Sequence, residues 1–463
     1  MQAYRLTAEV FCLSHLDRYV AYVPLKGLVL MVNAAAAHLL AELSDGTFSG
    51  PDERNLEVLS TLVDLGIVNG PEVEFHRDDD TEFRPIETTL FLTGACNLRC
   101  VYCYAFGGDR PGRMAEQVAR RAVDLVAENA GATGAGRFGV NFHGGGEPTL
   151  AWDLLTGVTA YGRRLAAERN LKCHVALATN GVLDAGQLAW IVEQVDDVNV
   201  SVDGMQAVHD ALRPLRDGGG SFAQALETIR TLSAGGRPFG LRMTSTRENV
   251  EHLPEAVRFF CETASPRAIH IEPVFPCGRC AAERVAGPTV DAFLRAFRAA
   301  RDVADRHGIR MYYSGARYPA VATAFCQAAG KSFTVTTEGS VTACYEVVDR
   351  GDPRAETFFF GRYDASADRF EFDPERLKRL SQLTVERLAF CRNCFCKYHC
   401  AGDCPAKRLA VFEGGVPDGQ VARCRIAQEL TRDQILSALD RGSRPMRVVA
   451  REYRAYREEV ESG

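Results

Sequence analysis

Short apolar runs alternate with amphipathic stretches from Glu87 to about His307, and this alternation restricts the possible folds more than any other feature. Each run has the length and composition of a buried strand, whereas the stretches between the runs have the periodicity of helices. Strand–helix units in succession predict an α/β fold, with a parallel sheet covered by helices. An open doubly wound sheet and a partial barrel both fit the number of units. The runs are TTLFLTG, RFGVNFH, CHVALAT, VNVSVDG, FGLRMTS and AIHIEP.

The regions before and after this alternation have other patterns. Residues 1 to about 80 contain two alternating segments, 19–23 and 27–32, which predict a hairpin. Two helices are predicted next, in AAAAHLLAEL and NLEVLSTLVDLGIV, followed by an acidic linker at 72–82. From about Met311 onward, Gly, Cys and charged residues dominate, which favours a region organised by metal rather than by a large core. A basic helix, PMRVVAREYRAYREEV, is predicted at the end.

Composition limits the function classes. The 463 residues are 46% hydrophobic and 25% charged, as in soluble globular proteins, and this length predicts several domains. A net charge of −6 argues against non-specific binding to nucleic acid. The sequence contains no run of about 18 uncharged apolar residues, so no membrane span is expected. The first residues, MQAYRLTAEVFC, lack the pattern of a signal peptide, so we expect a cytoplasmic protein.

Sixteen cysteines are the outlier in this composition. In a long chain without an export signal, clustered cysteines indicate metal or redox sites rather than disulfides. Four of the cysteines are single. Three of these, Cys12, Cys173 and Cys261, lie in apolar surroundings and are predicted to be small core residues. The fourth, Cys396, lies outside the spacings described below and is predicted to have no role in them.

The first cysteine cluster has the spacing C-x3-C-x2-C and directly follows the first predicted strand of the alternating region. It consists of Cys96, Cys100 and Cys103. Three thiolates on one short loop can hold three irons of a four-iron cluster and leave the fourth iron without a protein ligand. An open iron allows a small molecule to coordinate, as at catalytic zinc sites. A zinc site completed by His143 or His174 is the alternative.

These three cysteines, with the aromatic Tyr102 before the last of them, resemble the signature of the radical S-adenosylmethionine (SAM) superfamily. The resemblance implies a partial (β/α)6 TIM-like barrel with the cluster at the C-terminal ends of the strands. It also implies reductive cleavage of SAM to methionine and a 5′-deoxyadenosyl radical, which abstracts a hydrogen atom from the substrate. The resemblance therefore favours the partial barrel over the doubly wound sheet.

Motifs after the later strands extend this resemblance. The turn at 143–148, HGGGEP, resembles the motif that holds the SAM amino group, because glycines permit close approach and Glu147 offers a negative charge. Asn180 in TNG and Ser201 in SVDG resemble elements that line the SAM pocket, although both sequences are also ordinary turns. Arg242 can pair with the SAM carboxylate or have a structural role. The expected SAM contacts are Tyr102, Gly145, Gly146, Glu147, Asn180, Ser201 and Arg242.

Seven further cysteines resemble the SPASM extension of radical SAM enzymes. Their spacing is C-x12-G-x4-C, then C-x2-C-x5-C-x3-C, and then a last cysteine. The resemblance implies two auxiliary four-iron clusters, although zinc could satisfy four of the positions. The first cluster would take Cys326, Cys344 and Cys404, and the second Cys391, Cys394, Cys400 and Cys424. The first set lacks an evident fourth ligand, so Cys277, Cys280 or an open iron remain alternatives.

The N-terminal hairpin and helices resemble the winged-helix-like α+β module that recognises leader peptides by adding them as a strand to a sheet edge. A structural cap on the barrel is the alternative. The predicted domains are the leader-binding domain at 1–82, the radical SAM barrel at 83–310, the SPASM domain at 311–430 and a helical extension at 431–463.

Together, these features predict a radical SAM/SPASM maturase that installs a thioether, ether or carbon–carbon cross-link in a ribosomally made precursor peptide. The expected cofactors are three [4Fe-4S] clusters and SAM, with a flavodoxin- or ferredoxin-type electron donor. One alternative is an anaerobic sulfatase-type maturase that oxidises Cys or Ser to formylglycine. The other is a zinc-organised peptide-binding scaffold without chemistry. Glu272, at the end of the sixth predicted strand, is a candidate general base.

Overall fold

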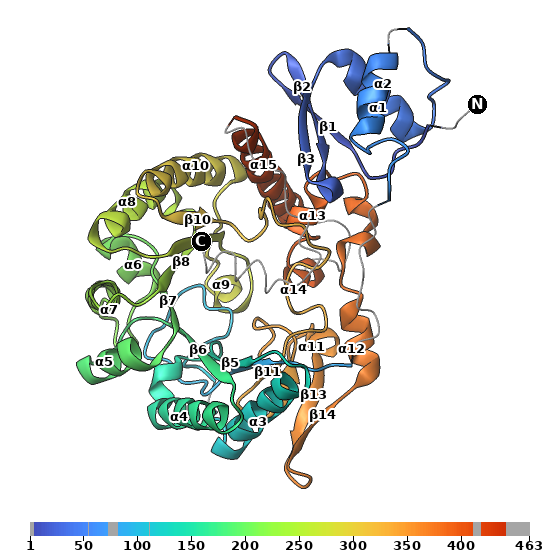
Figure 1. Cartoon of the computed structure of the whole chain (residues 1–463). Coiled ribbons are helices and arrows are strands. Elements are labelled where there is room, and N and C mark those ends of the chain that lie inside the picture. The colour runs from blue at the N-terminus through green and yellow to red at the C-terminus, as the bar shows by residue number, and fades with distance from the viewer. Residues whose placement is uncertain (1–3, 54, 73–81, 111, 411–417, 441–463) are drawn as a thin grey trace.

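The computed structural model describes residues 4–53, 55–72, 82–110, 112–410 and 418–440. Its largest element is a mixed sheet of eleven strands in the order β10-β9-β8-β7-β6-β5-β4-β11-β12-β13-β14 (Figure 1). The first seven strands of this order are parallel neighbours. They are β4 (Glu87–Leu90), β5 (Arg137–Phe142), β6 (Lys172–Thr179), β7 (Asp197–Ser201), β8 (Phe239–Ser245), β9 (Ala268–Pro273) and β10 (Arg310–Tyr312). All six predicted strands of the alternating region are therefore confirmed.

The strand order decides between the two α/β folds. A doubly wound sheet reverses its strand order at a switch point, whereas β4 to β10 follow one another in sequence order without reversal. The connecting helices that Figure 1 labels lie around the outside of the curved sheet, which is the arrangement of a partial barrel, except for α9 (Gly278–Ala282), which lies inside the curve. The connecting helices are α3 (Glu116–Ala132), η2 (Pro148–Ala151), α4 (Trp152–Glu168), α5 (Ala185–Gln194), α6 (Gln206–Leu212), α7 (Phe222–Ala234), η3 (Val250–His252), α8 (Leu253–Thr263), α9 (Gly278–Ala282) and α10 (Val290–Arg306).

Side-chain alternation gives each strand an outer and an inner face. In β8, Phe239, Leu241 and Met243 are buried in the core that the helices cover. Arg242 lies between them in sequence, so it points to the opposite, inner face, where it is exposed. The inner face therefore carries the polar side chains of the strands.

The C-terminal region continues the barrel sheet instead of forming a separate layer. β11 (Thr334–Val335) pairs in parallel with β4, and β12 (Ser340–Thr342), β13 (Phe359–Asp364) and β14 (Arg369–Phe372) follow as antiparallel strands. Buried aromatic side chains such as Phe333, Phe358 and Phe360 join these strands to the barrel core. The expectation that this region lacks a substantial core is therefore wrong. Strands of two or three residues are too short for their apolar side chains to form a recognisable pattern in the sequence.

Short helices complete the C-terminal region. They are α11 (Ala355–Phe358), α12 (Pro374–Ser381), η4 (Val385–Arg387), η5 (Ala389–Cys391), α13 (Lys397–Cys400), α14 (Pro405–Leu409) and α15 (Asp418–Asp440). The predicted boundaries at 310 and 430 fall inside β10 and α15, so both elements cross from one predicted domain into the next. The predicted C-terminal helix at 445–460 lies outside the described residues, as does most of the predicted acidic linker.

The N-terminal domain is a three-stranded antiparallel sheet with two helices. β1 (Phe11–His15), β2 (Arg18–Val23) and β3 (Leu28–Val32) form the sheet, with η1 (Pro24–Lys26) between β2 and β3. α1 (Ala34–Asp45) and α2 (Leu56–Asp64) cover one face. The predicted hairpin and both predicted helices are confirmed, and β1 is an additional strand. Cys12 was predicted to be buried, but it is exposed, because alternation along β1 turns Leu13 to the core instead.

The other face of the N-terminal sheet packs against the C-terminal region (Figure 1). Leu13, Val20 and Tyr22 contact Ile435 of α15 in one apolar cluster. Polar contacts lie beside it: Glu9 pairs with Lys397 and accepts a hydrogen bond of 2.7 Å from the Tyr398 hydroxyl. The sheet is therefore held against the segment that carries Cys391, Cys394 and Cys400. Among the described residues, no helix has the length and apolar character needed to cross a membrane.

Candidate functional site

The three-cysteine loop begins after β4, at the C-terminal end of the barrel strands. Backbone hydrogen bonds hold it to the loop after α6: the amide of Arg99 donates to the carbonyl of Pro214 at 2.8 Å, and that of Val101 to Leu212 at 3.0 Å. The amide of Gly107 donates to the Cys103 sulfur at 3.3 Å. A Cβ atom at Gly107 would lie 3.4 Å from the Cβ of Cys96 and 3.6 Å from the Cys103 sulfur, so this residue lies directly beside the thiols.

The ionisation of these thiols indicates what they need as a partner. Burial, the nearby charge of Glu147 and the other two thiols raise the pKa of Cys96 to about 12. Burial also raises the pKa of Cys100 to about 11, although the neighbouring Arg213 opposes the shift. Thiolates crowded in this way require a cation bound among them. An iron–sulfur cluster supplies that positive charge, so the three cysteines fit such a group.

The GGGE turn after β5 is pressed against the same loop. The amide of Gly146 donates to the carbonyl of Thr93 at 2.8 Å, and that of Glu147 to Ala95 at 2.8 Å. A Cβ atom at Gly146 would lie 1.9 Å from the carbonyl oxygen of Ala95, so only glycine permits this approach. Gly145 has a φ of +68°, which also favours glycine. The turn and the cysteine loop therefore form one unit.

Glu147 ties this unit to the end of β6. Its Oε1 accepts hydrogen bonds from the hydroxyl groups of Thr149 and Thr179, both at 2.9 Å, and from the Thr149 amide at 3.3 Å. Its Oε2 accepts a hydrogen bond from the amide of Asn180 at 2.8 Å, and a carboxylate oxygen has capacity for a further donor. Burial raises the pKa of Glu147, while these hydrogen bonds oppose the increase. The role predicted for it toward the SAM ammonium stays a prediction.

Asn180 links three of the sequence motifs. Besides its amide bond to Glu147, its side-chain nitrogen donates to Oδ1 of Asn97 at 2.7 Å and lies 3.9 Å from the Cys96 sulfur. Ser201 and Arg242 are register partners on β7 and β8, so they are neighbours across two strands near the same end of the barrel. The structure thus brings Asn180 to the cysteine loop and places Ser201 and Arg242 side by side.

Tyr102 is directed into a buried ionic network. Its hydroxyl donates to Asp203, which also accepts hydrogen bonds from Nε of Arg213 at 2.7 Å and from the amide of Thr244 at 2.8 Å. The Arg213 guanidinium lies 5.3 Å from the Tyr102 ring centroid. Asp203 lies in the SVDG sequence, which resembles an element of the SAM pocket or an ordinary turn and in which Ser201 is the predicted contact. Arg213 carries no sequence motif. Both residues support the cysteine loop and were missed.

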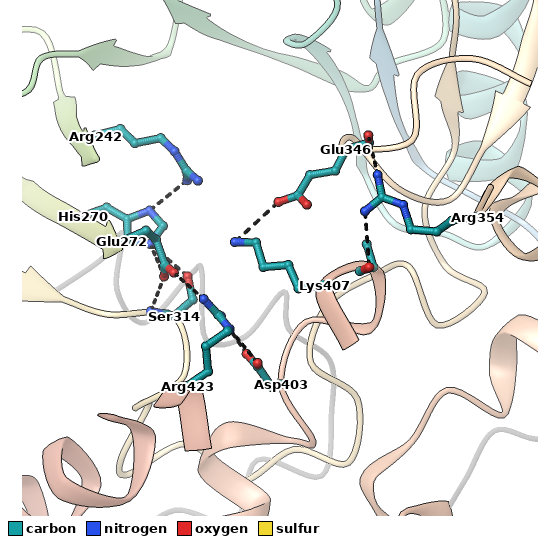
Figure 2. Close-up of polar contacts among 10 residues, drawn as sticks. Arg242, His270, Glu272, Ser314, Glu346, Arg354, Asp403, Lys407 and Arg423 are labelled. Atoms are coloured by element: carbon teal, nitrogen blue, oxygen red, sulfur yellow. Dashed lines mark hydrogen bonds and ion pairs between the residues drawn. The ribbon is translucent and has the colours of Figure 1, made fainter. Parts of the chain in front are cut away.

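A second group of charged side chains lies on the inner face, between the barrel strands and the C-terminal helices (Figure 2). We call it the inner polar cluster. Arg242 donates to Nδ1 of His270 at 3.0 Å, and Nε2 of His270 lies 3.1 Å from Oε1 of Glu272. From the C-terminal side, Lys407 pairs with Glu346 at 3.5 Å. The members of the inner polar cluster are Arg242, His270, Glu272, Ser314, Glu346, Lys407 and Arg423.

The contacts of Glu272 argue against its predicted role as a general base. Although burial opposes ionisation, the hydrogen bond from His270 and the charges of Lys407 and Arg423 hold its pKa well below the usual value. The amide of Ser314 also donates to Oε1 at 2.9 Å. A carboxylate held ionised by so many partners is a weak proton acceptor. Glu272 instead joins the barrel to α15 through Arg423, at 3.7 Å.

The first set of auxiliary cysteines lies close to Glu346 of this cluster. Charges of Glu346 and of Cys326 affect the pKa of both Cys344 and Cys404, and burial is the largest cause of the increase in each. In the other set, Cys396 is buried and its sulfur lies 3.5 Å from that of Cys394. The hydrogen bond from Cys396 lowers the pKa of Cys394 to about 6. Cys396 is therefore adjacent to the predicted ligands, although it lies outside their spacing.

The two alternatives for a fourth ligand of the first set have different surroundings. Cys280 is 1% exposed, and its thiol lies 3.5 Å from the carbonyl of Val285. Cys277 is half-buried, and the charges of Glu346 and Lys407 act on its thiol. Of the two thiols, only that of Cys277 has a pKa on which charges of the inner polar cluster act.

Comparison with known proteins identifies the central part of the chain. Residues 90–260 match the model of the Radical SAM superfamily. This segment is a radical SAM domain. Pre-heme d1 synthase of Dinoroseobacter shibae is 32% identical over 194 residues, which are 41% of this chain and 43% of that protein. The mycofactocin maturase MftC of Mycobacterium tuberculosis H37Rv is 34% identical over 179 residues, covering 37% and 40%.

The sporulation killing factor maturation protein SkfB of Bacillus subtilis is 28% identical over 183 residues, covering 38% of this chain and 39% of that protein. The matches span less than half the length of these curated relatives. The superfamily is one whose members bind SAM at a [4Fe-4S] cluster, and the radical SAM domain here contains the whole three-cysteine loop.

Solved structures extend the similarity of fold beyond the radical SAM domain. Native anSMEcpe with bound AdoMet has a TM-score of 0.61 and 17% identity, covering 76% of this chain and 99% of that one. Streptococcus suis SuiB bound to precursor peptide SuiA has a TM-score of 0.53 and 11% identity, covering 88% and 97%. At these identities the likeness concerns the fold alone.

Proposed function

We propose that this protein is a radical SAM peptide maturase, which modifies a ribosomally made precursor peptide by hydrogen abstraction and cross-linking. One observation carries the proposal: the three-cysteine loop, the GGGE turn and Asn180 form one hydrogen-bonded unit at the C-terminal end of the barrel strands. Two relatives that are named for maturation, the mycofactocin maturase MftC and the sporulation killing factor maturation protein SkfB, agree with it. When bound, the cluster and SAM would supply an electron and a carbon radical.

In this proposal each motif has a defined task toward SAM. Cys96, Cys100 and Cys103 hold the [4Fe-4S] cluster, and Oε2 of Glu147, which retains acceptor capacity, takes the SAM ammonium. The backbone of Gly145 and Gly146 lies against the bound cofactor. Tyr102 serves through its contact with Asp203, which fixes the loop between the second and third cysteines. Ser201 and Arg242 contact the remaining polar groups of SAM from adjacent strands.

The C-terminal region holds two auxiliary [4Fe-4S] clusters as a SPASM domain. All seven predicted ligands are buried or half-buried, which supports this assignment, because restricted access of solvent protects a cluster. In the first set, Cys277 is the favoured fourth ligand, since charges of the inner polar cluster act on the pKa of its thiol and not on that of Cys280. An electron donor of flavodoxin or ferredoxin type and a cytoplasmic location belong to the same proposal.

The N-terminal domain binds the leader segment of the precursor. Its sheet has the order β1-β2-β3, and neither edge pairs with a further strand among the described residues. An extended peptide can add to such an edge through main-chain hydrogen bonds. Leu16, Tyr19 and Met31 are exposed large side chains of this domain and offer apolar contact to a partner. The inner polar cluster then contacts the part of the peptide that is modified.

The experiment is anaerobic reconstitution with iron and sulfide, followed by incubation with SAM, a reductant and short peptides encoded beside the gene. We expect 5′-deoxyadenosine and a peptide that has lost two hydrogens and carries a protease-resistant link. A product that carries an aldehyde group, detected with an aldehyde-specific reagent, would instead indicate formylglycine formation. A colourless protein that holds zinc and leaves SAM intact would contradict the proposal and favour a binding scaffold.

A further inference from the structure

The segment between β9 and α10 contains a cysteine pair, Cys277-Gly-Arg-Cys280, whose function is not explained by the predicted clusters alone. α9 begins at Gly278, directly after Cys277. Of the two residues between these cysteines, Arg279 has the more extensive contacts, and it is 3% exposed. A buried arginine is costly unless its charge and its donors are satisfied, so its partners show what the segment is built to hold.

The side-chain partners of Arg279 belong to the cysteine loop and its continuation, and only its Nε has no hydrogen-bond partner among the described residues. Its backbone amide donates to the carbonyl of Cys103 at 2.9 Å, and Nη1 donates to the carbonyl of Cys100 at 2.8 Å. Nη2 donates to the carbonyl of Gly107 at 3.0 Å and pairs with Oδ2 of Asp109 at 2.7 Å. One residue thus binds the backbone at two predicted cluster ligands and at the glycine beside them.

Gly278 permits this contact. Its φ is +55°, and a Cβ atom there would lie 2.5 Å from the carbonyl oxygen of Tyr104 and 2.6 Å from that of Cys103. Any other residue would push α9 away from the loop, because the atoms it would meet are backbone atoms. The glycine and the arginine therefore act together: the first allows close packing and the second makes the hydrogen bonds.

Arg279 belongs to a group of three charges on one side of the loop. Asp109 is shared between Arg279 and Arg99, whose Nη1 lies 2.5 Å from its Oδ1. The two guanidinium groups and one carboxylate of this group carry one net positive charge. Reduction of a cluster held by three thiolates adds a negative charge, which a buried cation stabilises.

We propose that Arg279 is a positioning residue that fixes the backbone of the cysteine loop and sets the charge beside it. The effect on the loop is a property of the protein without metal. The effect on the cluster rests on the proposed function. The proposal predicts two separable consequences: a rigid loop before any cluster binds, and a bound cluster that is easier to reduce.

The test uses the full-length protein and the variants Arg279→Gln, Arg279→Lys and Gly278→Ala, with Arg295→Gln as control. Arg295 is an exposed arginine that pairs with Glu251 at 3.4 Å, far from the loop in sequence. Hydrogen exchange of residues 96–109 is measured on the metal-free protein. The midpoint potential is measured on the reconstituted protein, for the cluster whose spectrum responds to SAM.

For Arg279→Gln, we expect exchange of the loop amides to accelerate about tenfold. We also expect the reduction equilibrium to shift about tenfold toward the oxidised cluster, which is about 59 mV for one electron. Arg279→Lys retains the charge, so its potential stays close to that of the wild type while its exchange accelerates. Gly278→Ala displaces the arginine without changing the number of charges. We therefore expect both faster exchange of the loop amides and a change in the midpoint potential.

Loop exchange that is unchanged in both Arg279→Gln and Gly278→Ala, relative to Arg295→Gln, would overturn the positioning role. An unchanged potential in Arg279→Gln would overturn the charge role. If Arg279→Gln fails to fold, Arg279→Lys and Gly278→Ala carry the exchange test. A protein that binds no iron but shows the accelerated exchange would refute the proposed function and leave the positioning of the loop by Arg279 intact.

Discussion

The hydroxyl of Tyr102, between the second and third cysteines of the loop, donates a hydrogen bond to the carboxylate of Asp203 just after β7. Asp203 is fully buried in its side chain and forms an ion pair with Arg213, which is 8% exposed. Tyr102 therefore forms its hydrogen bond with a buried ion pair rather than with solvent. This relationship makes the shape of the cysteine loop dependent on the barrel core.

Substitution of Asp203 should be severe. In Asp203→Asn, the Arg213 charge stays buried without its carboxylate, which costs about 3–5 kcal/mol of stability. Tyr102→Phe removes only one hydrogen-bond donor to the Asp203 carboxylate and should lower stability by about 1–3 kcal/mol. Urea unfolding of the metal-free proteins, followed by fluorescence, measures both effects. Equal losses in the two variants would show that the ion pair does not dominate this network.

Substitution of Glu147 should weaken SAM binding more than it weakens the fold. Glu147→Gln keeps one oxygen acceptor for the threonine hydroxyl groups, but it removes the negative charge beside the three-cysteine loop. We expect the dissociation constant for SAM to rise at least about tenfold, equivalent to about 1.4 kcal/mol. Equilibrium dialysis on reconstituted protein measures it, with the exposed Glu168→Gln as control. Equal affinities in both variants would contradict the role proposed for Glu147.

The buried His209 predicts a loss of stability in acid. Burial, reinforced by the charge of Arg213, lowers the pKa of His209 to about 4. The unfolded chain binds a proton near pH 6.5, so the unfolded state takes up more protons between about pH 6.5 and about pH 4. Stability therefore falls as the pH decreases through this window, by an amount of order 3 kcal/mol in total.

The variant His209→Gln should remove this part of the pH dependence, because glutamine does not titrate and can still bond the Ser221 hydroxyl, which lies 3.0 Å from Nε2 of His209. The urea midpoint is compared at about pH 7.5 and about pH 5 in both proteins. A variant whose midpoint falls as steeply as that of the wild type would show that another group controls the acid response.

The contact between the N-terminal domain and the C-terminal region should depend on Glu9. Glu9→Gln removes the charge that pairs with Lys397, whose side chain is 10% exposed, and weakens the hydrogen bond from Tyr398. We expect faster hydrogen exchange at residues 391–400, by about fivefold to tenfold for a loss of about 1–1.4 kcal/mol. The exposed Glu57→Gln in α2 serves as control. Unchanged exchange would mean that contacts other than those of Glu9, such as the apolar cluster around Ile435, hold the domain.

The elements that were predicted and those that were missed differ in physical scale. The strands from β4 to β9 are buried apolar runs between amphipathic helices, so local periodicity is enough to find them. β11 has two residues and β12 has three, and their apolar side chains are buried only by pairing with the barrel sheet. No local pattern reports such pairing. The prediction that Cys12 is buried was wrong for a related reason. Which face of β1 its side chain occupies depends on the pairing register of the strand.

The candidate site divides in the same way. Motifs within one loop, such as the three cysteines and the GGGE turn, are visible in sequence because their spacing is local. The partners that fix them come from other elements: Asp203 and Arg213 for Tyr102, and Arg279 for Cys100 and Cys103. The inner polar cluster joins β8 and β9 to α14 and α15 and has no continuous motif. Tertiary contact of this kind requires the structure.

The most direct measurement concerns Cys100→Ala in anaerobically reconstituted protein. Removal of one of the three loop ligands should abolish release of 5′-deoxyadenosine from SAM under reducing conditions. Iron should fall from about twelve to about eight atoms per chain, because only the cluster of the loop is lost and two four-iron clusters remain. Release of 5′-deoxyadenosine at the wild-type rate by this variant would contradict the assignment of the loop.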